Sequence, residues 1–292
     1  MLYLPHQKML EVPQNTTLNC QGRLLSLNRP QVMGILNLTP DSFSDGGLFD
    51  TEAKALAQVE KMLLEGATII DIGGYSSRPG AIDIRPEEEL QRIKVTVARV
   101  LKEFPEAIVS IDTFRSSVAA PLLDMGVHMI NDISGGIADA EMLPIVGRFA
   151  APYVLMHMQG RPQTMQVAPE YEDVLDEVCS YFVMQIKAAR KAGIRDILLD
   201  PGFGFGKTLE HNWELFRNLG EFKVFGLPLL IGISRKSMVY RLFDTTPTNV
   251  LELTTALHVK ALEAGARILR VHDVQAAAKA IQLHQYLQHG AL

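Results

Sequence analysis

From residue 31 onward, short apolar runs alternate with longer segments in which apolar residues recur at helical spacing. The runs are, in chain order, QVMGILN (31–37), ATIIDIG (67–73), AIVSID (107–112), VHMIND (127–132), PYVLMH (152–157), DILLD (196–200), LPLLIGIS (227–234) and RILRVH (267–272). Runs of this length that are apolar on both faces are typical of parallel strands covered by helices. The pattern therefore predicts eight βα repeats.

The segments between the runs predict helices that cover a sheet. Leu56, Val59 and Leu63 recur at i, i+3 and i+7, and two other segments repeat this spacing. Glycines at 66, 193 and 265 follow such segments, where a left-handed residue commonly ends a helix. Eight repeats favour a (β/α)8 TIM barrel, and a doubly wound open sheet is the alternative.

Residues 1–30 do not fit the repeat. The alternating stretch LNCQGRLLSLNRP (18–30) predicts a short hairpin. We therefore expect two parts: an N-terminal extension, 1–30, that caps the barrel, and the barrel itself, 31–292.

The composition limits the partners. The 292 residues carry 28 Lys+Arg and 33 Asp+Glu, a net charge of −5, without a polybasic run, which argues against nucleic acid and anionic membranes. An anionic ligand must then be bound by a local cluster. Cys20 and Cys179 lack metal-type spacing and are expected to be reduced thiols. MLYLPHQKML resembles no signal peptide, and no run approaches the ~20 apolar residues of a membrane span, so a cytoplasmic protein is expected.

The stretch DPGFGFGKT (200–208) superficially resembles a phosphate-binding P-loop. The first glycine of that motif would fall on Pro201, which has no N–H to donate to a phosphate. A dinucleotide motif fails as well, because Lys207 stands where the third glycine belongs. We expect Lys207 to be a surface or helix-start residue, and another ligand must account for Asp200 and the glycines.

Nearly every predicted strand ends in a polar residue. These residues are Asn37, Asp71, Asp112, Asn131, His157, Asp200, Ser234, Arg235, Lys236, Arg270 and His272. A lone Asp at a strand end usually caps the next helix, but a closed barrel brings all these ends to one mouth. The carboxylates and Asn131 suit the N–H edge of a flat heterocycle such as a pterin. Arg270 and His272, with Asn37 and a bound Mg²⁺, suit a phosphate or a pyrophosphate.

Two of these residues have a structural alternative. His157 is as compatible with a hydrogen-bonded core residue as with a ligand, and Asp71 is compatible with a residue that only stabilises the Gly73–Gly74 turn.

Eight motifs resemble dihydropteroate synthase. They are GILNLTPDSFSDGG (34–47), DIGGYSSRPGA (71–81), SIDT (110–113), NDISGG (131–136), MHMQG (156–160), DPGFGFGK (200–207), GISRKS (232–237) and RVHD (270–273). The likeness runs from about Val32 to Val274. It implies a TIM-barrel transferase of folate biosynthesis, a cytoplasmic, Mg²⁺-dependent homodimer and a sulfonamide target. Such an enzyme condenses 6-hydroxymethyl-7,8-dihydropterin pyrophosphate with p-aminobenzoate and releases pyrophosphate and 7,8-dihydropteroate.

The resemblance also implies roles for residues. Asp112, Asn131, Asp200 and Lys236 would hold the pterin, and Phe205 would form a wall for the aminobenzoate ring. Asn37, through Mg²⁺, with Arg270 and His272 would bind pyrophosphate. Asp41, Phe43, Ser77, Arg78 and Pro79 lie in two loops that, with Ser237, would form the aminobenzoate pocket. Asp41, Arg78 and Lys236 are the expected catalytic residues.

The sequence departs from the family at two positions, and two other functions remain open. Tyr75 stands where the family usually has an acidic residue, and Ser77 replaces a threonine. One alternative is a pterin-binding methyltransferase module, which would pass a methyl group to a corrinoid protein and needs no pyrophosphate site. The other is a non-catalytic pterin-binding protein.

Overall fold

The computed structural model describes residues 16–39, 48–76, 82–160, 165 and 169–290. Within them, eight parallel strands close into a barrel in the order β10-β3-β4-β5-β6-β7-β8-β9. The strands are β3 (Gln31–Asn37), β4 (Ile69–Gly73), β5 (Ile108–Asp112), β6 (Met129–Asp132), β7 (Tyr153–Met156), β8 (Ile197–Asp200), β9 (Leu229–Ile231) and β10 (Ala266–Val271). The pairing of β10 with β3 closes the ring, so the predicted barrel is confirmed and the open sheet is excluded.

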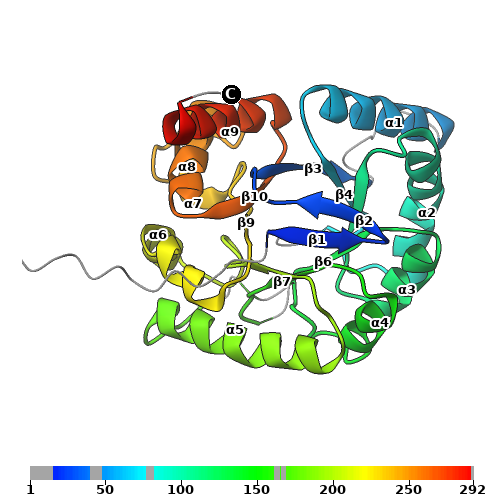
Figure 1. The fold of residues 1–292 in the computed structure, drawn as a ribbon, viewed down its shortest axis with the longest axis horizontal. Helices are drawn as coiled ribbons and strands as arrows, with labels where there is room; N and C mark the ends of the chain where they lie inside the picture. The colour runs from blue at the N-terminus through cyan, green and yellow to red at the C-terminus, as the bar shows by residue number, and fades with distance from the viewer. Residues whose placement is uncertain (1–15, 40–47, 77–81, 161–164, 166–168, 291–292) are drawn as a thin grey trace, which may run out of the picture.

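Helices cover the outside of this barrel (Figure 1). They are α1 (Leu48–Leu64), α2 (Pro86–Glu103), α3 (Ser116–Asp124), α4 (Met142–Phe149), α5 (Val174–Lys191), α6 (Leu209–Arg217), the 3₁₀ helix η2 (Leu219–Phe225), α7 (Ser237–Tyr240), α8 (Leu251–Glu263) and α9 (Val274–His289). Val59 and Ile93, from two of the predicted apolar faces, are fully buried. Gly66 follows α1 with φ +105°, as predicted for a helix stop. In the described chain, no helix is long and apolar enough to cross a membrane.

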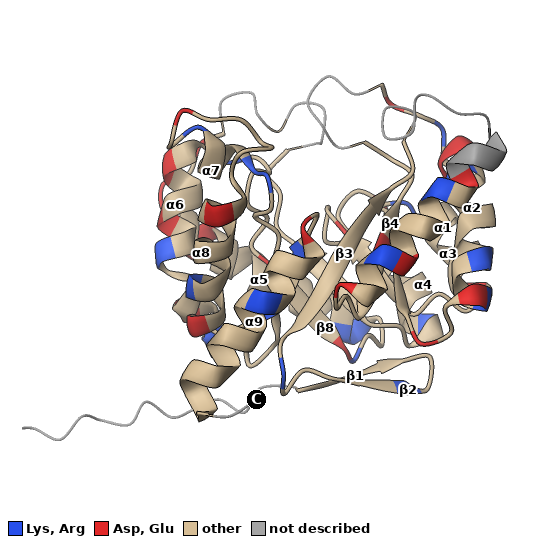
Figure 2. Cartoon of the chain, turned by 90° about the horizontal axis from the view of Figure 1, so that it is seen from above, with Lys and Arg blue, Asp and Glu red and all other residues tan. Residues whose placement is uncertain are grey.

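The N-terminal hairpin closes the end of the barrel opposite the carboxyl ends of the strands. Its strands, β1 (Thr17–Cys20) and β2 (Arg23–Ser26), pair antiparallel and lie across the bottom of the barrel (Figure 2). Hydrogen bonds join it to the barrel: Asp196 accepts from Asn19 N–H at 2.8 Å, and Arg23 donates to the carbonyl of Pro105 at 2.9 Å. The predicted cap is confirmed, whereas the division into 1–30 and 31–292 stays a prediction.

The barrel interior changes from apolar to polar along the strands. One buried apolar residue from each strand forms, with four from the hairpin, a separate core cluster: Leu18, Cys20, Leu25, Leu27, Met33, Ile69, Ile108, Met129, Val154, Leu198, Leu230 and Ile268. Because alternate strand residues face the same side, the next interior layer lies two residues further along each strand. That layer includes Asp71, Ser110, Asn131, Asp200 and Arg270. The polar site therefore begins directly above an apolar base.

Candidate active site at the barrel mouth

Asp71 connects three strands inside the barrel. Its side chain is completely buried, and Oδ2 accepts from Asn131 Nδ2 at 2.9 Å and from Arg270 Nε at 2.7 Å. The other oxygen, Oδ1, has no hydrogen-bond partner among the described residues. Asp71 therefore does more than stabilise the Gly73–Gly74 turn, since it orients two of the residues predicted to bind substrate.

Arg270 bridges two carboxylates in this arrangement. Besides its bond to Asp71, its Nη2 donates to Asp112 Oδ2 at 2.6 Å. Burial opposes the charge on Arg270, but Asp71 and Asp112 outweigh burial and raise its pKa. Burial raises the pKa of Asp112 to about 7; Arg270 opposes this shift, and the negative charge of Asp71 adds to it. Arg270, predicted to bind pyrophosphate, thus pairs with two carboxylates of the floor.

Asn37 lies at the rim beside this pair. In the β3–β4–β5 register, Asn37 is opposite Gly73, and Gly73 is opposite Asp112. A Cβ on Gly73 would lie 3.6 Å from Asn37 Oδ1 and 3.4 Å from Asp112 Cβ. Glycine at this position keeps space open between the two side chains.

Asp200 and Lys236 form the opposite side of the floor. Asp200 is 6% exposed, and burial raises its pKa. The hydrogen bond that its Oδ1 accepts from Gly202 N–H at 2.8 Å lowers the pKa and so opposes this shift. Burial and the nearby Arg270 lower the pKa of Lys236 to about 8, while Asp200 and Asp112 oppose that shift. The Lys236 ammonium lies 4.0 Å from the centroid of the Phe205 ring, within the range of a cation–π interaction.

The loop after β9 places the remaining predicted residues. Arg235 has a left-handed φ of +57° and pairs with Asp273, with Nη2 donating to Oδ1 at 2.7 Å. Next to it, the Ser234 hydroxyl accepts from His272 N–H at 3.2 Å and lies 3.2 Å from His272 Nδ1. Burial, assisted by Arg235, lowers the pKa of His272 to about 4, so the imidazole is neutral near pH 7.

Ser237 begins α7 and is half-buried. The predicted loop residues Asp41, Phe43, Ser77, Arg78 and Pro79 lie outside the described residues.

Comparisons with known proteins agree with this geometry. A model of the family "Pterin binding enzyme" matches residues 33–272. The chain belongs to this family. It is 46% identical over 265 residues to a dihydropteroate synthase of Escherichia coli (strain K12), covering 90% of this chain and 93% of that protein. A dihydropteroate synthase of Haemophilus influenzae is 42% identical over 270 residues, covering 92% of this chain and 98% of the relative.

Solved structures show the same relationship. A crystal structure of Yersinia pestis dihydropteroate synthase with a sulfonamide drug complex has a TM-score of 0.87 at 42% identity, covering 93% of this chain and 99% of that chain. Xanthomonas albilineans dihydropteroate synthase with 4-aminobenzoic acid has a TM-score of 0.88 at 40% identity, covering 94% and 99% of the two chains. The predicted family and barrel are confirmed.

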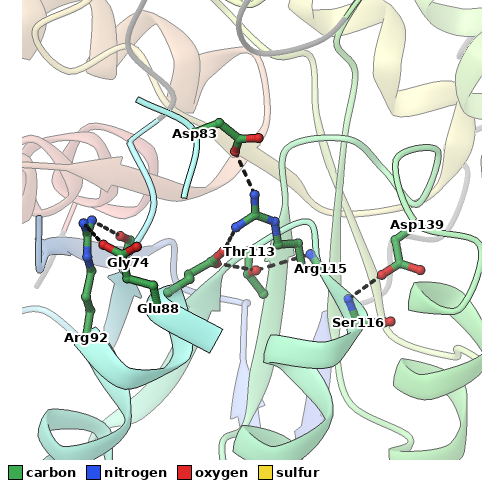
Figure 3. Close-up of polar contacts among 9 residues, drawn as sticks. Gly74, Asp83, Glu88, Arg92, Thr113, Arg115, Ser116 and Asp139 are labelled. Carbon is green, nitrogen blue, oxygen red and sulfur yellow. Dashed lines mark hydrogen bonds and ion pairs between the residues drawn. The ribbon is translucent and has the colours of Figure 1, made fainter. Parts of the chain in front are cut away.

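A second buried network in this pterin-binding enzyme was not predicted. Glu89 of α2 is fully buried and accepts from Thr113 Oγ1 at 2.6 Å and from Arg115 Nη1 at 2.7 Å. Arg115 also donates to Asp83 at 2.9 Å, and its guanidinium lies 4.9 Å from the centroid of the Tyr75 ring. Figure 3 shows Arg115 between Asp83 and Thr113. The network joins the chain after β4 to the chain after β5, directly behind Asp112.

The sequence carries no signal for this network. Glu89 stands beside Glu87 and Glu88 at the start of a helix, where acidic residues usually face solvent and favour the helix N-terminus. Only the packing of α2 against β4 and β5 shows that one of the three is buried.

Lys207 directly precedes Thr208, the N-cap of α6, as one of its two predicted roles requires, but the prediction of a surface position was wrong. Its side chain is 3% exposed and lies under the loop between β8 and α6, where Nζ is 2.9 Å from His157 Nδ1. His157 is 6% exposed, so the structure supports the hydrogen-bonded core alternative. Neither residue is free to bind substrate at the mouth.

Proposed function

We infer that this chain condenses 6-hydroxymethyl-7,8-dihydropterin pyrophosphate with p-aminobenzoate to give 7,8-dihydropteroate and pyrophosphate. The chain is a transferase of folate biosynthesis, as its relatives named dihydropteroate synthase indicate. The observation that carries the assignment is the group of polar side chains, half-buried Asp112 with buried Asn131 and Asp200, in one barrel interior beside Lys236. Buried acceptors of this kind need N–H donors, which the edge of a pterin supplies.

The pterin lies on the floor of the mouth. The Asp200 carboxylate accepts hydrogen bonds from the exocyclic amino group and from N3–H of the pterin, because two parallel N–H donors match two carboxylate oxygens. Asn131 is already oriented by Asp71, which accepts from its Nδ2 at 2.9 Å and leaves its amide oxygen for a ligand donor. Asp112 and Lys236 complete the contacts around the ring.

The pyrophosphate lies at the rim, near Asn37, Arg270 and His272. Two of the five N–H groups of Arg270 donate to Asp71 and Asp112, and the other N–H groups can donate to phosphate oxygens. Asn37 offers an amide oxygen, and the described residues contain no group of three His, Cys, Asp or Glu suited to a metal. This donor set fits Mg²⁺ held by one protein oxygen together with substrate phosphates and water. When bound, Mg²⁺ neutralises charge on the departing pyrophosphate.

The chemistry is a displacement in which the leaving group departs first. The methylene C–O bond breaks, pyrophosphate leaves with the electron pair, and a cation remains at the methylene carbon. The amine nitrogen of p-aminobenzoate then forms the C–N bond and loses a proton. The protein needs no strong base; it must hold charge and exclude water, since water would capture the cation. Arg270 and His272 face the leaving group, while Asp200 holds the opposite, pyrimidine edge of the pterin.

The aminobenzoate ring packs against Phe205, which Lys236 contacts at 4.0 Å, with Ser237 at the start of α7 beside it. The solved relative from Xanthomonas albilineans carries 4-aminobenzoic acid, which supports this half of the assignment. Asp41, Phe43, Ser77, Arg78 and Pro79 complete the pocket in this proposal, with Asp41, Arg78 and Lys236 as catalytic residues. A methyltransferase module would need none of the rim cations.

The enzyme is a cytoplasmic homodimer in this proposal. Large apolar side chains are exposed on one face of the last helix, at Leu283, Tyr286 and Leu287 of α9. Contiguous exposed apolar surface marks interaction sites, and a second copy of the chain fits helices near the C-terminal end. Sedimentation velocity of the protein and of Leu287→Arg tests this: the proposal requires a dimer that the substitution weakens.

A pyrophosphate-release assay with both substrates tests the activity. Release should require p-aminobenzoate and match the dihydropteroate formed one to one. Pterin binding without pyrophosphate release under any substrate combination would reject the synthase and favour the methyltransferase or the non-catalytic alternative. Loss of methyl groups from a methylated reduced pterin to a corrinoid acceptor would identify the methyltransferase.

A further inference from the structure

Lys207 is surrounded by acceptors that belong to two different segments. Its Nζ lies 2.9 Å from His157 Nδ1 and donates to the carbonyls of His157 at 3.2 Å, Gly202 at 3.0 Å and Phe205 at 3.1 Å. The first two acceptors belong to His157, which directly follows β7, and the other two belong to the loop between β8 and α6. The ammonium therefore joins this loop to the neighbouring strand.

The donors and acceptors define the state of the pair. An ammonium has three N–H groups and no acceptor, so the neutral His157 ring accepts at Nδ1 and keeps its proton on Nε2. Burial, assisted by Lys207, lowers the pKa of His157 to about 2, which agrees with a neutral ring. In its charged form Lys207 has three N–H groups, which these four acceptors already share, so none remains for a phosphate.

The loop backbone lies directly against the chain that follows β7. Gly202 has φ +70°, and a Cβ there would lie 1.9 Å from the His157 carbonyl oxygen. Gly206 has φ +59°, and its Cβ would lie 2.5 Å from the carbonyl oxygen of Gln159. The glycines of DPGFGFGKT thus permit close approach, and Lys207 supplies the attraction that holds the two backbones together.

The loop ends in contacts with the active site. Lys207 holds the Phe205 carbonyl, and the Phe205 ring lies under the Lys236 ammonium at 4.0 Å. A Cβ on Gly204 would lie 3.2 Å from Lys236 Cδ, so the loop contacts this lysine along its stem as well. Displacement of the loop would therefore move both Phe205 and Lys236.

We propose that Lys207 and His157 form a buried clamp that positions the Gly202–Phe205 loop, and through it Phe205 and Lys236, for the aminobenzoate step. Lys207 is a positioning residue, because it contacts neither substrate nor a reacting atom. The proposal rests on the proposed function for the roles of Phe205 and Lys236, but the clamp itself concerns only the ligand-free chain.

Lys207→Met tests the clamp, since methionine retains an unbranched apolar stem and removes every N–H donor. Hydrogen–deuterium exchange in peptides covering 201–208 should become faster, while exchange in β8 stays unchanged. The KM for p-aminobenzoate should rise on the order of 10-fold, the size expected for about one net hydrogen bond. The KM for the pterin pyrophosphate should rise less, because Asp200 belongs to β8 itself. Lys191→Met, at the exposed end of α5, is the matched control and should change neither quantity.

The His157 variants test the same contact from the other side. His157→Asn can place an amide oxygen near the Nδ1 position and should retain most of the loop protection, whereas His157→Leu should behave like Lys207→Met. These two variants give the same readouts if Lys207→Met fails to fold. A purely structural role predicts equal losses for both His157 variants, and that result would overturn the clamp.

A double variant separates positioning from a general effect. In a Phe205→Ala background, Lys207→Met should raise the KM for p-aminobenzoate by a smaller factor than it does in the wild type, because the part of its effect that acts through the Phe205 ring is already lost. Independent, multiplied increases would overturn the proposal. Hydrogen–deuterium exchange needs no substrate, so it tests the clamp separately from the proposed function. If the wild type shows no turnover but Lys207→Met exchanges faster, the proposed function is rejected and the clamp is retained. If Lys207→Met is active and its exchange is unchanged, the clamp is rejected and the proposed function is retained.

Discussion

Arg270 donates hydrogen bonds to Asp71 and Asp112. Asn131 donates to Asp71 Oδ2, the same oxygen that accepts from Arg270 Nε. Each of these side chains is therefore held in place before any ligand arrives. A preorganised floor of this kind reduces the cost of ordering side chains on binding.

Asp200→Asn tests the pterin contact. The change keeps the shape but sets an N–H₂ donor against pterin N–H donors, which should weaken pterin binding by about 2–3 kcal/mol, on the order of 30- to 150-fold. Calorimetry with a pterin measures this. Asp196→Asn is the matched control at the other end of the same strand, where the carboxylate accepts from Asn19 N–H. Near wild-type affinity for Asp200→Asn would remove Asp200 from the pterin site.

Asn37→Ala tests the rim. If Asn37 contributes an oxygen to a Mg²⁺–pyrophosphate complex, its loss should weaken binding of the pterin pyrophosphate far more than binding of the same pterin without phosphates. Titrations of both ligands with and without Mg²⁺ give the comparison. Equal losses for the two ligands would show that Asn37 acts on the pterin ring instead.

Lys207 should make stability depend on pH. Burial lowers its folded-state pKa from 10.5 to about 7, with Asp200 opposing and Lys236 adding to the shift, while neutral His157 contacts it. Between pH 7 and 10.5 the unfolded chain then binds more protons at this site. Stability therefore rises with pH in this window, by at most about 1.4 kcal/mol per unit.

Denaturant unfolding of the wild type and of Lys207→Met at pH 6 to 9 isolates this contribution. The free energy of unfolding of the wild type should increase relative to that of Lys207→Met as the pH rises from 7 to 9. A difference that stays flat, or that shifts the other way, would mean that Lys207 keeps its ordinary pKa.

At the scale of elements, the hairpin provides a base for the barrel. Leu18 and Leu27 are completely buried in the same cluster as one residue from every barrel strand. The hairpin side chains thus fill the bottom of the barrel, and the apolar layer separates them from the polar floor of the site.

Leu27→Ala should therefore cost stability rather than activity. We expect a loss of about 2–5 kcal/mol in the free energy of unfolding, because the substitution leaves a cavity in a closed core. Leu24→Ala, in the same hairpin but 71% exposed, should change stability by less than about 0.5 kcal/mol. Urea unfolding gives both values, and KM for both substrates should stay at the wild-type level. A raised KM in Leu27→Ala would show that the base also shapes the mouth.

At the scale of the whole molecule, the rim and the floor share Arg270. A rim ligand that draws Arg270 away from Asp112 changes the charge on the floor, so binding at the two places should be coupled. The aminobenzoate pocket should depend on the same event, because the pocket residues predicted from the sequence, such as Asp41 and Ser77, follow strands β3 and β4 along the chain.

We expect p-aminobenzoate to bind weakly to the free enzyme and more tightly with Mg²⁺-pyrophosphate and a pterin present. The coupling must be reciprocal, with a factor in the range of about 5 to 150. Titration of p-aminobenzoate with and without saturating Mg²⁺-pyrophosphate and pterin measures it. Arg78→Ala or Asp41→Ala should reduce the factor and leave pterin binding nearly unchanged. Tight binding to the empty enzyme would mean that the pocket is preformed.

The sequence by itself determined the elements and the end of the barrel that carries the site. Strand and helix periods are local properties, so the eight runs and the helical spacing of Leu56 and Val59 were enough to predict βα repeats. The residues at the strand ends could be predicted to meet because parallel strands in one closed sheet all point the same way. The motif from Asp200 to Lys207 could be assigned to a pterin site by resemblance, although the sequence did not show what Lys207 does.

Only the tertiary structure decided which side chains pair. Asp71 accepts hydrogen bonds from Asn131, 60 residues away in the sequence, and from Arg270, 199 residues away. Which residues become such partners depends on the register of the closed barrel. The burial of Glu89 and Lys207 depends on how α2 and the β8–α6 loop pack on neighbouring strands. A buried charge looks the same in the sequence as a solvated one, because its partners come from other elements and burial itself is set by packing.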